Sequence, residues 1–235
     1  MYSERLARAL PDVRRGIAEA CARAGRDDAD AIVLVAVTKG HPPEAIRAAH
    51  AHGLRVVGEN RVQEGEAKRA SLGDVPVEWH LVGHLQRNKV KRALCAFEVV
   101  QSVDSVRLGE EIDREAAKAD RRMDVLVEVN ASGEASKYGL PVDDALPVIA
   151  HVARLDRLRV LGLMTMAPWT ADEEVLRTVF RRTRECFERC REEVSGFEAR
   201  HLSMGMSNDY PIAVEEGATM VRIGTALFGE RGSAP

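Results

Sequence analysis

The stretch "IVLVAVTKGHPPEAIRAAHAHG", residues 32–53, joins an aliphatic run to an amphipathic, alanine-rich segment. The aliphatic run is typical of a buried strand, and the segment after the two prolines has a helical pattern. On an extended strand, Lys39 shares one face with the three odd-numbered valines before it, because side chains alternate. The stretch therefore predicts a strand–helix unit with a lysine where the strand ends.

Eight aliphatic runs of this kind recur along the chain, with helix-like, charge-rich segments between them. The runs are "IVLVAVTK" (32–39), "LRVVGEN" (54–60), "VEWHLVG" (77–83), "FEVVQSV" (97–103), "MDVLVEVN" (123–130), "RVLGLMTM" (159–166), "ARHLSMG" (199–205) and "TMVRIGTA" (219–226). Strands that alternate with helices indicate parallel pairing in a sheet covered on both faces. Eight such units predict an α/β fold, a (β/α)8 TIM barrel. A doubly wound open sheet is the alternative, but no GxGxxG motif follows the first strand.

The chain is expected to form one domain. No linker rich in Pro, Gly or Ser divides its 235 residues, so the domain is expected to span residues 1–235. Residues 1–30 alternate Leu, Ala and Ile with Arg and Glu, which predicts an extra amphipathic helix. We expect this helix to pack outside a barrel formed by residues 31–230.

The composition excludes several classes of protein. A formal net charge of −3 argues against a partner such as nucleic acid or a membrane surface. No apolar stretch approaches the roughly 20 residues that span a bilayer, and the N-terminus lacks the apolar core of a signal peptide. The four cysteines form neither a CxxC pair nor a zinc-like array. We therefore expect a soluble, cytoplasmic protein without a metal site.

The strand ends supply the candidate functional residues. In a (β/α)8 barrel the active residues lie at the C-terminal ends of the strands, which places Lys39 at the mouth of the barrel. A lysine that extends its amine from a strand end into solvent is the alternative. The second strand run closes on Asn60, and His80 and His84 flank the third run. Both histidines are interpreted as hydrogen-bonded structural residues, because no HExxH pattern is present.

The last two strand ends predict a phosphate site. Arg222 is a charge inside an apolar run, Gly224 allows close approach to the backbone, and Thr225 can donate a hydrogen bond. "LSMGMSND" (202–209) supplies two serines ahead of a helix. Ser207 as a plain helix N-cap is the alternative. An amine near other cations is nucleophilic toward carbonyls, so these residues together suggest a Schiff base to a phosphorylated aldehyde.

Seven motifs resemble the YggS/PROSC family of pyridoxal phosphate (PLP) homeostasis proteins. They are "VAVTKGHP", "GENRVQE", "WHLVGHLQRNKVK", "SVDS", "VEVNASGEASKYGL", "GLMTM" and "LSMGMSNDYPIAVEEGATMVRIGTALFG", and they extend from about residue 34 to 230. The resemblance implies a barrel similar to the N-terminal domain of alanine racemase, with PLP held as an internal aldimine on Lys39. It also implies a monomer that carries or buffers PLP, with transient contact to apoenzymes that use it.

The resemblance also implies which residues bind the cofactor. They are Lys39, Asn60, Ser203, Ser207, Arg222, Gly224 and Thr225. In the family pattern the arginine faces the pyridine nitrogen. The glycine, the threonine and the serines hold the phosphate, and the asparagine lies near the cofactor. No catalytic residue is implied.

Two features favour a carrier over an enzyme. Arg222 cannot give up its proton, so it leaves the pyridine nitrogen unprotonated and the ring a poor electron sink. The sequence closes soon after "ALFGER" (226–231), so we expect no room for the second domain that supplies an acid/base group in alanine racemase. A PLP-dependent amino-acid racemase is the alternative, which Tyr138 or Tyr210 placed over the cofactor would support. A Schiff-base aldolase acting on sugar phosphates is the third hypothesis.

Overall fold

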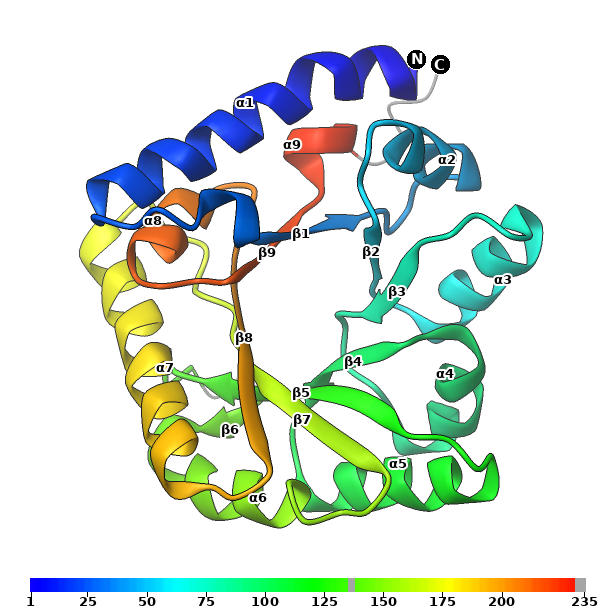
Figure 1. The fold of residues 1–235 in the computed structure, drawn as a ribbon, viewed down its shortest axis with the longest axis vertical. Helices are drawn as coiled ribbons and strands as arrows, with labels where there is room; N and C mark the ends of the chain where they lie inside the picture. Colours follow the sequence, from blue (N-terminus) through cyan, green and yellow to red (C-terminus); the bar gives the residue numbers. More distant parts are fainter. Residues whose placement is uncertain (135–137, 231–235) are drawn as a thin grey trace.

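The computed structural model describes residues 1–134 and 138–230, and its centre is a closed ring of eight parallel strands (Figure 1). These strands are β1 (Val33–Val37), β2 (Val56–Glu59), β3 (Glu78–Leu81), β4 (Val99–Val103), β5 (Met123–Asn130), β7 (Leu158–Met164), β8 (Phe197–Met206) and β9 (Met220–Ile223). Each strand pairs with the next in this order, and β9 pairs with β1. The closure confirms the predicted (β/α)8 barrel and excludes the open sheet. Residues 135–137 of the motif "VEVNASGEASKYGL" lie outside the described residues.

Helices surround the ring. They are α1 (Tyr2–Arg23), α2 (Pro43–Ala51), α3 (Val62–Leu72), α4 (Val90–Ala96), α5 (Val106–Lys118), α6 (Ala145–Val152), α7 (Glu173–Glu193), α8 (Tyr210–Glu215) and α9 (Thr225–Phe228). Short 3-10 turns lie at η1 (Ala29–Ala31), η2 (Arg87–Lys89) and η3 (Val142–Asp144), and a short strand, β6 (Leu140–Pro141), pairs with the end of β5. Among the described residues, no helix has the length and apolar character needed to cross a membrane.

The first helix closes the outer layer of the barrel. α1 packs against α2, α8 and α9, and Figure 1 shows it lying across the outside of the ring. Its buried face carries Leu6, Leu10, Val13 and Ile17, whose spacing of three and four residues forms one apolar stripe. Because α9 is a single turn, α1 provides the cover that a longer final helix would give. The predicted outer helix is thus present, although it ends at Arg23 rather than at residue 30.

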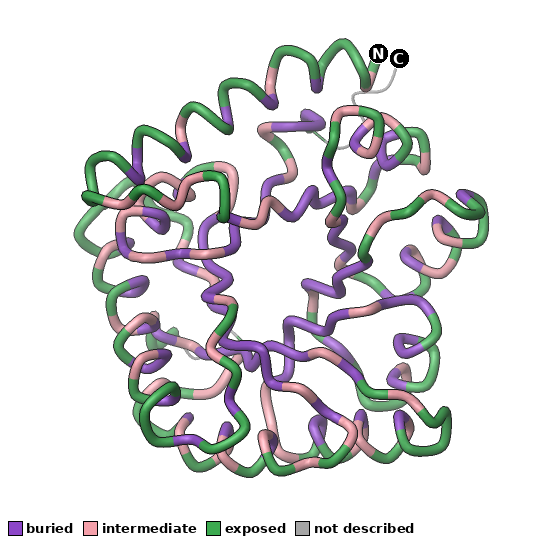
Figure 2. Tube along the Cα trace, viewed as in Figure 1, coloured by how far each residue is buried: buried purple, intermediate pink, exposed green. Residues whose placement is uncertain are grey.

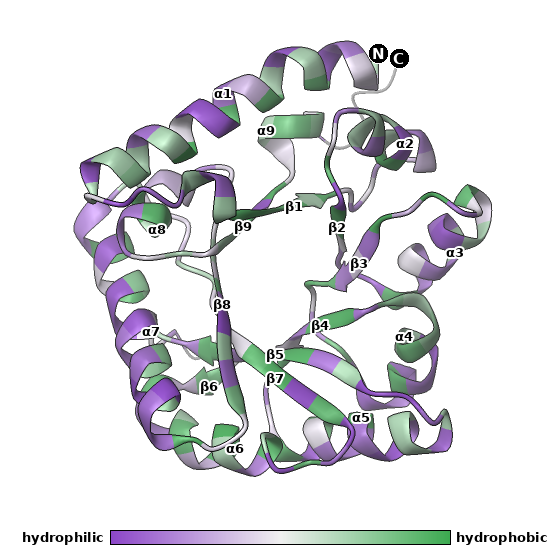
Figure 3. Ribbon diagram, in the orientation of Figure 1, coloured by the Kyte–Doolittle hydropathy of each residue, from purple (hydrophilic) through white to green (hydrophobic). Residues whose placement is uncertain are grey.

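Two apolar clusters hold the barrel together. The larger one lies between the strands and the helices, and it accounts for the buried inner faces of the helices in Figure 2. The outward faces of the same helices are mainly hydrophilic (Figure 3). The smaller cluster includes Val35, Leu126 and Met220, whose side chains fill the interior of the ring. Buried polar side chains such as Gln101 and Arg222 share this interior. The ring interior is therefore a mixed core rather than a purely apolar one.

Candidate functional site

A cavity of about 400 Å³ opens at the C-terminal ends of the strands. The residues that line it are Val37, Lys39, Asn60, Val82, Gly83, His84, Tyr138, Met166, Trp169, Met206, Ser207, Asn208, Arg222, Gly224 and Thr225. This is the end at which (β/α)8 barrels hold their functional residues. The mixture of apolar side chains with a few polar groups is typical of a small-molecule site.

Six of the seven residues implied to bind the cofactor line this cavity. They are Lys39, Asn60, Ser207, Arg222, Gly224 and Thr225. Ser203 is the exception, because it is fully buried inside the barrel and does not form part of the described wall. Its hydroxyl donates to Gln101 Oε1 at 2.7 Å and accepts from Arg222 Nη1 at 2.8 Å. The structure thus places Ser203 against Arg222, and its direct contact with a phosphate stays a prediction.

Arg222 is a buried cation with a fixed orientation. Its Nη1 donates to the Ser203 carbonyl and its Nη2 donates to the Thr165 carbonyl, both at 2.8 Å. Burial lowers the pKa of Arg222 to about 10, against the opposing effect of Asp209 and Glu128. The guanidinium is therefore still protonated at neutral pH, and it can only donate hydrogen bonds to a ligand.

The loops after β8 and β9 meet at one polar corner of the cavity. Ser207 Oγ accepts a hydrogen bond from the Ala226 N–H at 3.1 Å, so this serine caps α9 rather than α8, the helix that follows it in sequence. A Cβ atom at Gly224 would lie 3.2 Å from the Val37 carbonyl oxygen, so glycine avoids a tight contact between the loop after β9 and the end of β1. Together with Thr225, Ser207 brings two hydroxyl groups to this corner, and hydroxyl groups can donate hydrogen bonds to an anion.

A buried ion cluster supports the segment that carries Lys39. Lys68 Nζ donates to both Glu59 Oε1 and Glu64 Oε1 at 2.7 Å. It also donates to the Thr38 carbonyl at 2.7 Å, directly before Lys39 in the chain. Sequence analysis did not single out Lys68, although Glu64 and Lys68 stand four residues apart on one helix, a spacing typical of an ion pair.

The same cluster fixes the chain on the other side of Lys39. The Gly40 N–H donates to Glu64 Oε1 at 2.6 Å. Glu59, which directly precedes Asn60, is fully buried and accepts a hydrogen bond from the Thr38 hydroxyl at 2.6 Å. Burial raises the pKa of Glu59, although its bonds to neighbouring donors oppose the rise. The cluster therefore sets the backbone at two strand ends that line the cavity.

Glu128 is a second buried acid inside the barrel. It lies on β5, is 3 % exposed, and faces the ring interior next to the charge of Arg222. Burial, together with the carboxylate of Asp104, raises the pKa of Glu128 to about 7, and the attraction of Arg222 only partly offsets this rise. In the sequence this residue was only one polar position within an aliphatic run.

Aromatic side chains flank the mouth of the cavity. The rings of His84 and Tyr138 stack with centroids 4.0 Å apart, and His84 Nδ1 lies 3.2 Å from the Asp104 carboxylate. Tyr138 is thus the tyrosine that the cavity presents, whereas Tyr210 packs against Gly16 of α1. His80 is buried and hydrogen-bonded, as interpreted from the sequence, but His84 lines the cavity instead.

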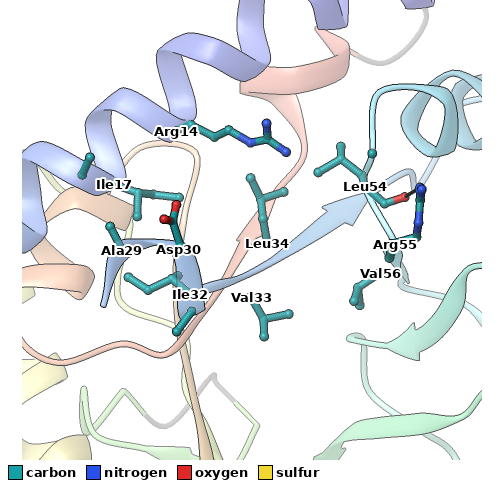
Figure 4. A pocket seen from close by; sticks show the side chains of 13 residues that line it. Arg14, Ile17, Ala29, Asp30, Ile32, Val33, Leu34, Leu54, Arg55 and Val56 are labelled. Carbon is teal, nitrogen blue, oxygen red and sulfur yellow. Dashed lines mark hydrogen bonds between the residues drawn. The ribbon is translucent and has the colours of Figure 1, made fainter. Parts of the chain in front are cut away.

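A second cavity, of about 530 Å³, lies between α1 and the starts of β1 and β2 (Figure 4). Arg14, Asp30 and Arg55 are its charged side chains, set among aliphatic ones such as Leu34. Arg55 is already engaged, because its Nη1 donates to the His50 carbonyl at 2.8 Å. This cavity is at the N-terminal ends of the strands, the face of a (β/α)8 barrel that serves stability rather than chemistry.

Comparison with known proteins identifies the class and then the family. A family model described as "Alanine racemase, N-terminal domain" matches residues 15–232. A protein of Aquifex aeolicus, "Pyridoxal phosphate homeostasis protein", is 42% identical over 97% of both chains. A protein of Pseudomonas aeruginosa with the same name is 41% identical over 96% of both chains. The chain therefore belongs to the pyridoxal phosphate homeostasis protein family, as its motifs predicted.

A solved structure extends the comparison to the three-dimensional level. PipY of Synechococcus elongatus, solved with PLP bound, is 37% identical and has a TM-score of 0.80. The match covers 91% of this chain and 100% of PipY. The barrel that surrounds the Lys39 cavity is thus similar to one whose structure contains PLP.

Proposed function

We propose that this protein binds PLP in the Lys39 cavity and acts as a carrier or buffer in intracellular PLP homeostasis, without turnover of its own. One observation carries the proposal: a strand-end lysine, a buried arginine and a corner of hydroxyl groups line a single cavity of about 400 Å³. The names of the relatives and the PLP bound to PipY support the choice of ligand.

The cavity residues fit the groups that PLP carries. PLP supplies an aldehyde that condenses with an amine, a pyridine ring that can accept electrons, and a phosphate. Lys39 provides the amine, and we propose that it forms the Schiff base. Ser207, Gly224 and Thr225 would hold the phosphate, while Arg222 would face the ring nitrogen. Asn60, which lines the same cavity, would contact the cofactor.

The fixed arginine supports a role without turnover. Arg222 is held by two backbone carbonyls and keeps its proton at neutral pH, so it can donate to a ring nitrogen but cannot protonate it. The side chains at the mouth are open to solvent, with Trp169 87% exposed and Tyr138 55% exposed. Water can therefore reach the amine of Lys39 when the ligand leaves, which suits reversible loading.

Covalent attachment at Lys39 tests the proposal. The purified protein with added PLP is expected to show a visible absorbance band, and borohydride reduction followed by peptide mass mapping is expected to locate the adduct on Lys39. Lys39→Ala should lose both signals while it keeps its fold, because this residue lies beyond the end of β1. The matched control is Lys89→Ala, which alters a lysine of η2. An adduct that persists in Lys39→Ala would contradict the assignment.

Tyr138 gives a specific reason to test a racemase. Its phenol lines the cavity, where a second acid/base group would be needed. We expect the PLP-loaded protein to exchange the Cα hydrogen of alanine with solvent deuterium no faster than free PLP does, as followed by proton NMR. Faster exchange that falls in Tyr138→Phe would favour a PLP-dependent amino-acid racemase instead.

We further propose that the protein acts as a cytoplasmic monomer that contacts PLP-dependent apoenzymes transiently. The four free thiols support a reducing compartment. The exposed Trp169 beside the cavity mouth supports a brief protein contact there. Light scattering on the purified protein would test the monomer, and transfer of PLP to a purified apoenzyme would test the contact.

A further inference from the structure

A row of hydrogen bonds crosses the interior of the barrel and ends at Arg222. Arg222 Nη1 lies 2.8 Å from Ser203 Oγ, and Ser203 Oγ lies 2.7 Å from Gln101 Oε1. Gln101 Nε2 is 2.7 Å from His80 Nδ1, and His80 Nε2 is 2.8 Å from Glu78 Oε1. The row thus connects four strands, β9, β8, β4 and β3, across the ring.

The row runs from one face of the barrel to the other. Glu78 is the first residue of β3, at the N-terminal ends of the strands, and its side chain is 51% exposed. The remaining members are all buried, with exposures of 4% or less for Arg222, Gln101 and His80. A buried polar group is costly unless it is hydrogen-bonded, so Ser203, Gln101 and His80 depend on their neighbours in the row. Arg222 also donates to two backbone carbonyls, and the row adds the bond to Ser203 Oγ.

The chemistry of the end members gives the row one direction. Arg222 can only donate, so Ser203 Oγ accepts from it, and the serine hydroxyl then donates to the carbonyl oxygen of Gln101. The amide nitrogen of Gln101 consequently faces His80 Nδ1, which must accept. The second amide hydrogen has its own partner, since Gln101 Nε2 is 3.2 Å from the Met220 sulfur.

The direction of these hydrogen bonds also fixes the tautomer of His80. With Nδ1 as an acceptor, the proton of His80 sits on Nε2 and is donated to the Glu78 carboxylate. A reversed Gln101 amide would point an N–H at Ser203, and the serine hydroxyl would then lose the acceptor of its own proton. The orientation of Gln101 therefore determines whether the Ser203 hydroxyl, which accepts from Arg222, has an acceptor for its own proton.

We propose that Gln101 and His80 are positioning residues for Arg222, which hold the guanidinium in place from within the barrel through Ser203. Neither residue is among the described residues that line the cavity. The expected effect of these residues on PLP binding rests on the proposed function, because it requires the ring nitrogen of PLP to face Arg222. The position of Arg222 itself does not depend on that function.

Two readouts on Gln101→Met test the positioning role. The substitution keeps the length of the side chain but removes its acceptor and its donor. In a crystal structure of the variant without PLP, we expect the Arg222 guanidinium to be displaced or to have lost its bond to Ser203 Oγ. With PLP, we expect the dissociation constant to rise about tenfold, as for a lost buried hydrogen-bond partner, and the pH midpoint of the absorbance band to shift.

A pair of His80 variants supplies a second test if Gln101→Met does not fold. His80→Asn places an amide oxygen where Nδ1 was and should preserve the orientation of Gln101, whereas His80→Leu should not. We therefore expect wild-type absorbance behaviour in the first variant and a shifted midpoint in the second. Thr183→Val is the matched control, because it removes a buried hydrogen bond within α7 that has no connection to the row.

The outcomes separate this inference from the proposed function. An unchanged Arg222 position together with unchanged PLP binding in Gln101→Met would overturn the positioning role. If the wild-type protein forms no adduct on Lys39, the proposed function fails, and the crystal structure of the variant then decides the inference alone. A midpoint shift of equal size in Thr183→Val would show that the change reports general loosening, and it would also overturn the inference.

Discussion

Lys68→Met is expected to lower the free energy of unfolding by about 3–5 kcal/mol, a large part of the roughly 5–15 kcal/mol that stabilises an ordinary protein. Lys68 makes three hydrogen bonds of 2.7 Å, and its removal leaves Glu59 as an uncompensated carboxylate in a fully buried position. Urea denaturation followed by circular dichroism would measure the loss. PLP binding should weaken as well, because the residues before and after Lys39 lose their support.

Two further variants show whether the ion cluster is the cause. The double variant Glu59→Gln/Lys68→Met removes both charges and should recover much of the lost stability, since a neutral buried pair has no uncompensated charge. Arg92→Met is the matched surface control, because its ion pair with Glu66 lies on the exposed side of the helices. If Lys68→Met were as harmless as the control, the cluster could not be what supports Lys39.

Glu128→Gln is expected to change how stability depends on pH. The pKa of Glu128 rises from 4.5 to about 7 on folding, mainly because of burial. Between these two values the unfolded chain has lost the proton and the folded chain still holds it. The folded state therefore binds more protons, and stability falls as pH increases through this window. A shift of this size corresponds to about 3 kcal/mol lost between pH 4 and pH 8.

The variant should lack this loss, so the difference between the two proteins is the quantity to measure. The free energy of unfolding of Glu128→Gln minus that of the wild type should increase by about 3 kcal/mol from pH 4 to pH 8. Burial lowers the pKa of His201, which makes stability rise with pH in both proteins and therefore cancels in the difference. A difference that stays constant with pH would mean that Glu128 ionises normally in the folded state.

The fold could be predicted from the sequence because its signals are local. Each aliphatic run overlaps one observed strand, and the alternation with helices is enough to imply parallel pairing. The runs extend past the strands where polar residues follow them, and this is why Lys39 and Asn60 lie at the cavity rather than within the sheet. Strand-end position thus predicted six of the fifteen described residues that line the cavity: Lys39, Asn60, Ser207, Arg222, Gly224 and Thr225.

The remaining features depend on contacts that no local pattern reveals. Ser203 and Gln101 are 102 residues apart, so their hydrogen bond could not be deduced from either segment alone. Lys68 lies in a charged helix whose pattern suggests solvent exposure, yet β1 and β2 bring acceptors to it and bury it. The family motif implied that Ser203 binds the phosphate. Its side chain on β8 instead points into the barrel, where its hydroxyl accepts a hydrogen bond from Arg222.

The position of α1 has a consequence for the order in which the protein is completed during synthesis. α1 leaves the ribosome well before two of its partners, α8 and α9, which lie near the other end of the barrel sequence. Until β9 has emerged, the apolar stripe of Leu6 to Ile17 has only part of its docking surface, and the ring cannot close. The apolar stripe of α1 therefore becomes fully buried only after α8, α9 and β9 have been synthesised, which makes its burial a late, long-range step of folding.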